Sequence, residues 1–268
     1  MTSAFSSAPV ALTIAGSDCS AGAGLQADLK TFSAHGVYGL TAVTCVVAEV
    51  PGIVTRIQAV DAATFADQLR LLLEAFPVAA VKTGMLYSRE IIELTAAALG
   101  SLKVRPKLVI DPVMVATSGD ALVRDDAVDA YIRLLFPMAD LITPNMDEAS
   151  VLLGQRITRT SQLHAAADVL RSKYGCPVLI KGGHLKGAEA LDVLRDAAGF
   201  AEYRAPFVPG VSTHGTGCTF SAAIAAGLAT GRSLREAVKA GKRYVTRAIG
   251  QSFRWGSGRK RIDALNHF

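Results

Sequence analysis

The sequence has few of the features that mark several protein classes. Its four cysteines (Cys19, Cys45, Cys176 and Cys218) show no Cys-x-x-Cys spacing and no histidine at zinc-ligand distance. That pattern excludes a disulfide scaffold and a zinc module, and it favours a reduced, cytosolic protein. The first 17 residues carry no charge, so they lack the basic segment that opens a signal peptide.

Long uninterrupted apolar runs are also missing. Residues 205–231 contain no Asp, Glu, Lys or Arg, but Pro206, Pro209 and five glycines interrupt them. A membrane helix needs about 20 consecutive apolar residues, so we expect no membrane span. The chain shows no linker, low-complexity tract or internal repeat. We therefore predict one domain over residues 1–268.

The charge balance limits the partners that the chain can bind. Charged residues make up 19% of the chain and hydrophobic ones 50%, which excludes a disordered protein. The net charge of +5 suits anionic ligands. The dense basic cluster at 254–261 is of a kind that is usually solvated surface, so we expect no nucleic-acid partner.

The hydrophobic pattern alternates between short β-branched runs and helical spacing. It predicts strands at 9–15, 39–49, 54–60, 78–82, 107–110, 141–143 and 178–180, and a hairpin at 191–195 and 202–208. It predicts helices at 25–34, 62–75, 89–99, 125–136, 147–153, 161–174, 217–229 and 233–250. This alternation is typical of an α/β fold in three layers (α/β/α), with a central, mostly parallel sheet between helices.

Polar residues follow the predicted strands where each strand ends. These are Gly16-Ser17-Asp18, Glu49, Lys82-Thr-Gly84, Asp111-Pro112, Thr143-Pro-Asn145 and Lys181-Gly-Gly-His184. In open parallel sheets, ligands bind at the carboxyl ends of the strands. The sequence therefore predicts a ligand site at this edge.

The stretch Ser212-Thr-His-Gly-Thr-Gly-Cys-Thr219 precedes an alanine-rich helical run. Gly215 and Gly217 free the backbone to turn its N–H groups inward at a helix N-terminus, which is a cradle for phosphate oxygens. The same field is expected to favour the thiolate of Cys218. The alternative is a glycine-rich turn that leads into a buried helix.

Two further groups fit phosphate chemistry. Asn145 and Glu148 place oxygen ligands on one helix face near Asp111, as magnesium requires. Equally, this pair has the pattern of a helix N-cap with an acid in its first turn. Lys181 can reach a transferred phosphoryl group, or it is a solvated lysine at a strand end.

A different enzyme class provides a competing hypothesis. Gly22-Ala-Gly-Leu-Gln-Ala27 matches the dinucleotide pattern G-x-G-x-x-A, and Glu49 ends the second strand as a ribose-binding acid would. Six residues separate Gly22 from the preceding strand, whereas this turn should follow the strand directly. The spacing argues against an NAD-dependent oxidoreductase.

Several segments run in one order across residues 10–230: Thr13-Ile-Ala-Gly-Ser-Asp18, Gly24-Leu-Gln-Ala-Asp-Leu-Lys-Thr-Phe32, Lys82-Thr-Gly-Met85, Asp111-Pro-Val-Met114, Thr143-Pro-Asn-Met-Asp-Glu148, Lys181-Gly-Gly-His184 and His214-Gly-Thr-Gly-Cys-Thr219. Together they resemble the hydroxymethylpyrimidine and phosphomethylpyrimidine kinases of thiamine biosynthesis. The resemblance implies a ribokinase-like fold, ATP and Mg²⁺, and a cytoplasmic homodimer.

The resemblance also assigns roles to residues at the matching positions. It makes Cys218 the catalytic base and Gly215, Thr216 and Gly217 the anion hole. Nucleotide binding falls to Lys181 and Thr213 together with the loop glycines, and magnesium to Asp111, Asn145 and Glu148. The positions that match pyrimidine contacts are Gly16, Asp28, Val47, Glu49 and Met85.

Glu49 departs from the family pattern, which more often has a glutamine there. An amide both donates to and accepts from an aminopyrimidine edge, whereas an ionised carboxylate only accepts. Glu49 must therefore be protonated or meet a protonated ring. The expected activity is phosphorylation of hydroxymethylpyrimidine and then of its monophosphate. A pyridoxal or pyridoxine kinase, which shares the Gly-Thr-Gly-Cys loop, is the alternative, and a non-catalytic sensor of the same ligand is a distant third.

Overall fold

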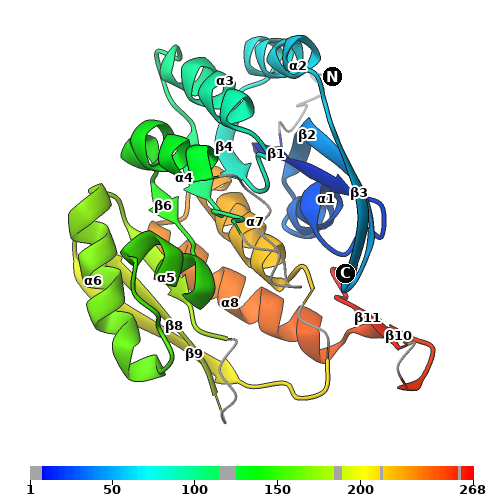
Figure 1. Cartoon of the computed structure of the whole chain (residues 1–268), viewed down its shortest axis with the longest axis vertical. Coiled ribbons are helices and arrows are strands. Elements are labelled where there is room, and N and C mark those ends of the chain that lie inside the picture. Colours follow the sequence, from blue (N-terminus) through cyan, green and yellow to red (C-terminus); the bar gives the residue numbers. More distant parts are fainter. Residues whose placement is uncertain (1–7, 115–124, 184–188, 212–213, 259–260) are drawn as a thin grey trace, which may run out of the picture.

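A nine-stranded sheet runs through the centre of the protein (Figure 1). The computed structural model describes residues 8–114, 125–183, 189–211, 214–258 and 261–268. The strand order is β3-β2-β1-β4-β5-β6-β7-β8-β9. The strands are β1 (Val10–Asp18), β2 (Tyr38–Val50), β3 (Ile53–Ala59), β4 (Val78–Thr83), β5 (Lys107–Ile110), β6 (Leu141–Ile142), β7 (Val178–Lys181), β8 (Glu189–Asp196) and β9 (Gly199–Pro206).

Six adjacent strands are parallel: β2, β1, β4, β5, β6 and β7. At the edges of the sheet, β3 pairs antiparallel with β2, β8 with β7 and β9 with β8. One face of the sheet packs against α2 (Ala62–Ala75), α3 (Arg89–Gly100), α4 (Asp125–Ala130), α5 (Met146–Leu153) and α6 (Leu163–Tyr174). The other face packs against α1 (Gly24–Ala34), α7 (Thr216–Ala229) and α8 (Leu234–Gly250). The predicted three-layer α/β/α fold is confirmed.

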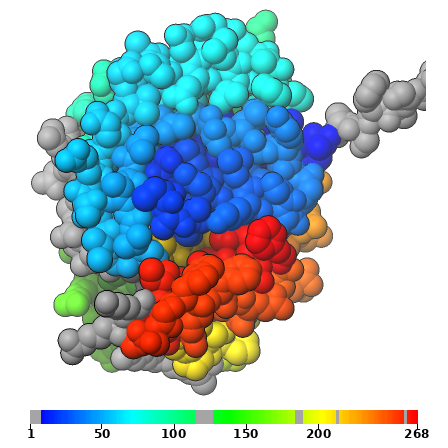
Figure 2. Space-filling view, turned by 90° about the vertical axis from the view of Figure 1, so that its right-hand side faces the viewer, coloured from blue at the N-terminus to red at the C-terminus, as the bar shows by residue number. Residues whose placement is uncertain are grey.

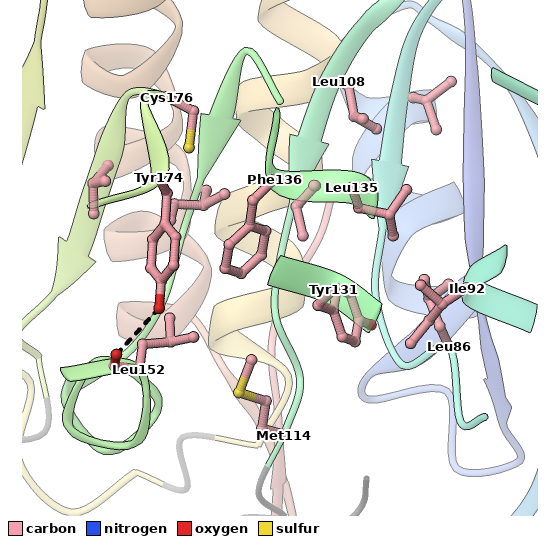
Figure 3. Packing of buried hydrophobic residues seen from close by; sticks show 14 of the residues in the cluster. Leu86, Ile92, Leu108, Met114, Tyr131, Leu135, Phe136, Leu152, Tyr174 and Cys176 are labelled. Atoms are coloured by element: carbon pink, nitrogen blue, oxygen red, sulfur yellow. Dashed lines mark hydrogen bonds between the residues drawn. The ribbon is translucent and has the colours of Figure 1, made fainter. Parts of the chain in front are cut away.

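The strands are buried on both faces because helices cover both. On β1, Leu12 and Ile14 enter the core on the α3 side, whereas Ala11 enters the core beneath α7. Figure 3 shows the first of these cores, where the rings of Tyr131, Phe136 and Tyr174 pack in series. Alternation along each strand therefore divides the core into two halves.

The predicted helix at 125–136 is not regular. α4 passes into a π-helical turn at Tyr131–Leu135 and a 3-10 turn at Phe136–Met138. Pro137 lacks the N–H that an α-helix needs there. The widened turn lets the hydroxyl of Tyr131 donate to the Gly84 carbonyl over 3.0 Å, inside the core.

A two-stranded hairpin, β10 (Phe253–Trp255) and β11 (Ile262–Ala264), follows α8 and was not predicted. Figure 2 shows this C-terminal segment, in red, against the blue N-terminal segment, and a cavity of about 290 Å³ separates Lys30 from Leu265. Among the described residues, no helix combines the length and the apolar character that a bilayer crossing requires.

Candidate active site

A cavity of about 850 Å³ opens at the carboxyl edge of the sheet. The residues predicted from the sequence that line it are Gly16, Val47, Glu49, Met85, Asp111, Asn145, Glu148, Lys181, Gly215, Thr216, Gly217 and Cys218. They come from the ends of β1, β2, β4, β5 and β7, the start of α5 and the start of α7. The parallel strands thus bring segments distant in sequence to one site, as the pattern of polar strand ends predicted.

Of the predicted site residues that the structure describes, Asp28 alone does not line this cavity. Thr213 lies outside the described residues, and the same holds for His184 of the motif that begins at Lys181. Asp28 is fully buried beneath the cavity, where Lys82 and Thr13 bind its carboxylate. In this structure Lys82 lines the cavity and Asp28 does not, so the contact of Asp28 with a pyrimidine stays a prediction.

The loop before α7 depends on its glycines. Gly215 is the N-cap of α7 and has a φ of 79°, and a Cβ atom there would overlap the carbonyl oxygen of Gly22. A Cβ at Gly22 would in turn lie 2.8 Å from Cδ2 of His214. The turn at 22–24 and the loop at 214–217 therefore interlock, and the dinucleotide-like Gly22 faces protein rather than an open phosphate site.

Asp18, at the end of β1, holds this arrangement together. Its carboxylate accepts the N–H groups of Ser20, Gly22 and Ala23, and it lies 3.1 Å from Nε2 of His214. Burial opposes the charge, but the hydrogen bonds from His214 and the loop hold the pKa of Asp18 well below its usual range. Polar atoms of Asp18, His214 and Glu49 lie within 4.8 Å of one another. Because both Asp18 oxygens already accept N–H bonds, this group organises the loops rather than a metal ion.

Lys181 and Asp111 meet at the start of α7. Nζ of Lys181 lies 2.6 Å from Oδ1 of Asp111. A Cβ at Gly217 would come within 3.1 Å of Nζ and 3.7 Å of Oδ2 of Asp111, so the helix backbone passes directly over the pair. Burial lowers the pKa of Lys181, but Asp111 and Glu148 outweigh that effect and raise it, which keeps the ammonium charged.

Asn145 and Glu148 form a capping box at the start of α5. The Asn145 side chain accepts the Glu148 N–H over 2.9 Å, and the Glu148 carboxylate accepts the Asn145 N–H over 2.8 Å. The helix-cap alternative is therefore present in the structure. The pKa of Glu148 is raised to about 8, mainly by burial; Lys181 opposes the rise and Asp111 adds to it. Two crowded carboxyl groups beside a phosphate cradle suit a divalent cation, which would neutralise both.

The thiol of Cys218 faces the cavity, and the Gly24 N–H donates to its sulfur. Burial raises the pKa of this thiol to about 11, an effect opposed by Lys82 and enhanced by Asp111. The expected thiolate is therefore wrong for the ligand-free site. Loss of water around the sulfur outweighs the positive end of α7, which alone would favour the anion.

Glu49 lies at the opposite side of the cavity from α5 and is half-buried. Burial raises its pKa and the nearby Asp18 raises it further, whereas His214 lowers it. A neutral carboxyl group both donates and accepts, as the amide at this position does in the family pattern. The direction of this shift is the one that pairing of Glu49 with an aminopyrimidine requires.

Lys82 is one of the cavity residues to which the sequence analysis gave no role. It is fully buried, ends β4 next to Thr83 and Gly84, and places its ammonium 2.9 Å from where a Gly84 Cβ would stand. Its signal in the sequence was a lysine at the end of an apolar strand. Its ion pair with Asp28 could not be predicted, because Asp28 lies 54 residues earlier in the sequence.

The match to a family model covers residues 18–263 and carries the description "Phosphomethylpyrimidine kinase". The chain belongs to this family. A hydroxymethylpyrimidine/phosphomethylpyrimidine kinase of Rhizobium meliloti (strain 1021) is 45% identical over 97% of both chains. The resemblance inferred from the motifs is thus confirmed over almost the whole sequence.

Solved structures from this branch share the fold. A phosphomethylpyrimidine kinase of Clostridium difficile 630 superimposes with a TM-score of 0.78 at 38% identity, covering 90% of this chain and 99% of that one. The ADP complex of a Bacillus subtilis pyridoxal kinase gives 0.86 at 38% identity, covering 97% and 98%. Family members of this fold thus include kinases named for either alcohol, and residues must be compared to separate them.

Proposed function

We propose that this protein transfers the terminal phosphoryl group of ATP to the hydroxymethyl group of hydroxymethylpyrimidine, and then to the resulting monophosphate, in thiamine biosynthesis. The observation that carries the proposal is the convergence of Gly217, Lys181 and Asp111 at the start of α7, in one cavity with Glu49. The relatives named for this activity support it.

The residues divide the reaction between them. Backbone N–H groups of residues 215–218 bind the transferred phosphoryl group, and Lys181 neutralises its charge. Positioning and neutralisation dominate phosphoryl transfer, in which the transition state is loose. Cys218 takes the proton of the alcohol as its thiolate, a strong base because the thiol pKa is about 11, and Lys82 enlarges the thiolate fraction.

Asp111 and Glu148 are the residues that would hold Mg²⁺, with Asn145 fixing the orientation of the Glu148 carboxylate. When bound, this ion supplies charge neutralisation to the nucleotide phosphates. Lys181 then has Asp111 as a fixed partner while its ammonium reaches the phosphoryl group.

A specific observation keeps pyridoxal as the second candidate substrate. Pyridoxal kinases of known structure share the fold at 34% to 38% identity, and Glu49 stands where the pyrimidine kinases more often have glutamine. The pyrimidine remains the first candidate because the family model and the relatives over nearly the whole chain carry its name.

A coupled ADP-release assay on hydroxymethylpyrimidine, its monophosphate and pyridoxal, run in parallel, tests the proposal. We expect both pyrimidines to be phosphorylated with a higher kcat/KM than pyridoxal. A tenfold preference for pyridoxal would overturn the assignment, and absence of turnover with all three alcohols would overturn the kinase itself.

The finer expectations are that the enzyme is cytoplasmic and a homodimer. The β2–β3 hairpin exposes the apolar side chains of Val46 and Val50 on β2 and of Ile53, which pairs with Val50, and apolar side chains of this kind pair subunits. Light scattering behind a sizing column would show a dimer for the wild type and a monomer for Val46→Asp, which lies outside the cavity lining.

A further inference from the structure

A buried histidine near the end of the chain contacts the phosphate-binding helix. His267 is 3% exposed, and its Nε2 lies 3.0 Å from Oγ1 of the fully buried Thr219. The hydroxyl of Tyr244 on α8 donates to the His267 carbonyl over 2.8 Å, and the Asn266 N–H donates to the Ala248 carbonyl over 3.1 Å. Two contacts with α8 therefore fix the segment that carries the imidazole.

Thr219 stands in the first turn of α7, directly after Cys218. Its N–H donates to the Gly215 carbonyl over 2.9 Å and so closes that turn. The N-cap Gly215 offers no side-chain hydrogen bond, and the turn contains no acidic residue. A helix start without a cap of its own depends on contacts from the rest of the protein.

Such contacts reach the first two turns of α7 from opposite sides. On the sheet side, Oγ of Ser221 lies 2.8 Å from Oγ1 of Thr143 at the end of β6. Residues two positions apart on an α-helix point about 200° apart, so Thr219 and Ser221 face in nearly opposite directions. His267 therefore holds the side of the turn that the sheet does not reach.

The imidazole of His267 is neutral in this setting. Its pKa is lowered to about 4, mainly by burial and in smaller part by the ammonium of Lys30. A neutral ring carries one donor and one acceptor nitrogen, and the threonine hydroxyl can pair with either. The contact with Thr219 is thus a single buried hydrogen bond between uncharged groups.

We propose that His267 is a positioning residue for phosphoryl transfer: its imidazole holds Thr219, and with it the first turn of α7, where the N–H groups of residues 215–218 meet the transferred phosphoryl group. This inference rests on the proposed function, because it takes that turn to be the anion hole. His267 itself touches neither the cavity lining nor any reacting atom.

A double-mutant cycle in the ADP-release assay tests the proposal. His267→Ala and Thr219→Val should each lower kcat about tenfold, as expected for one lost buried hydrogen bond. The KM of the alcohol should change less than kcat, since the alcohol side of the cavity is untouched. The double variant should be no slower than either single one, and His267→Gln, whose amide can reach the same hydroxyl, should recover most of the rate.

A matched control separates positioning from stability. Thr95 on α3 is also fully buried, and its hydroxyl donates to the Ile91 carbonyl over 2.7 Å, far from the site. Thr95→Val should lower the melting temperature without changing kcat. If His267→Ala does not fold, the nearly isosteric Thr219→Val removes the same hydrogen bond by itself.

A second readout needs no substrate. Alkylation of Cys218 by iodoacetamide, followed by peptide mass mapping, should accelerate severalfold in His267→Ala and Thr219→Val and not in Thr95→Val. Faster alkylation in these two variants, combined with no turnover of any alcohol by the wild type, would refute the proposed function but not the positioning of the α7 turn by His267. Unchanged alkylation, or rate losses that multiply in the double variant, would overturn the positioning role.

Discussion

The ammonium of Lys82 lies 2.8 and 3.0 Å from the two carboxylate oxygens of Asp28, and solvent reaches neither side chain. The hydroxyl of Thr13 donates to the same carboxylate over 2.6 Å. Burial raises the pKa of Asp28 although Lys82 and Thr13 both lower it. Each of the two buried charges is therefore stable in the protein interior only because the other is present.

Lys82→Met should destabilise the protein by about 3–5 kcal/mol, because it leaves Asp28 buried without a partner. The double variant Lys82→Met/Asp28→Asn should recover a large part of that loss. Urea unfolding measures both. The exposed pair Arg70–Asp67, 3.0 Å apart, is the control, and Arg70→Met should leave the stability nearly unchanged. Equal losses for the single and the double variant would contradict this account.

Cys218→Ala should lower turnover sharply while ATP binding, measured by calorimetry, is retained. The wild-type rate should rise with pH through the alkaline range, because the thiolate fraction grows about tenfold per unit below a thiol pKa of about 11. The residual rate of Cys218→Ala should lack that rise. Near-normal turnover in this variant would show that another group is the base, although the anion hole could still stand.

Glu49→Gln should preserve or improve the use of the pyrimidine. In the wild type, KM for hydroxymethylpyrimidine should increase as pH rises through the elevated pKa of Glu49, since the ionised form loses its donor. The amide does not titrate, so the variant should lack this increase. Complete loss of pyrimidine use in Glu49→Gln would mean that the carboxylate itself is required.

Gly215→Ala should abolish turnover and destabilise the protein by ~2 kcal/mol or more, since the left-handed backbone and a clash with the Gly22 carbonyl act together. Gly231 offers a matched control. It has a φ of 82°, and no atom lies within 4 Å of its ideal Cβ. Gly231→Ala should show the backbone strain alone and keep normal activity. If both variants behave alike in the assay, the packing of the two loops is not what shapes the anion hole.

Acid should weaken the fold through His267. Its pKa is about 4 in the folded protein and about 6.5 in an unfolded chain, so the unfolded state takes up a proton that the folded state refuses. Stability should therefore fall as pH drops from 6.5 towards 4, by up to roughly 3 kcal/mol. Comparison of unfolding curves for the wild type and His267→Gln isolates this contribution. Parallel pH profiles for the two proteins would show that another group is responsible.

Much of the fold follows from local pattern. Apolar runs such as 78–82 and 107–110 could only be buried strands, and the glycines after the helix at 25–34 and before the one at 217–229 set their limits. Because ligands bind at the carboxyl ends of parallel strands, the sequence predicted one site for Glu49, Asp111 and Lys181, and all three line the same cavity. These predictions succeeded because each depends on neighbours in sequence or on the direction of parallel strands.

The features that were missed depend on distant partners. The ion pair of Asp28 with Lys82 was missed because the two residues lie 54 positions apart and no local pattern links them. The thiol of Cys218 was expected to ionise at a helix start, whereas in the folded protein its burial beside Asp111 raises the thiol pKa to about 11. The pairing of β10 with β11 at the surface likewise has no strong periodic signal. Whether Gly16, Val47 and Met85 contact the pyrimidine stays a prediction.

The interlock of Gly22 with Gly215 has a consequence for how the enzyme matures. Gly22 follows β1, the first strand of the sequence, whereas Gly215 caps α7, which lies in the last fifth of the sequence. A nascent chain that lacks α7 can carry most of the ligand-facing residues and still have no place for a phosphate. Contacts between segments so far apart in sequence form slowly. During refolding, nucleotide binding should therefore appear only in the last step, when α7 docks.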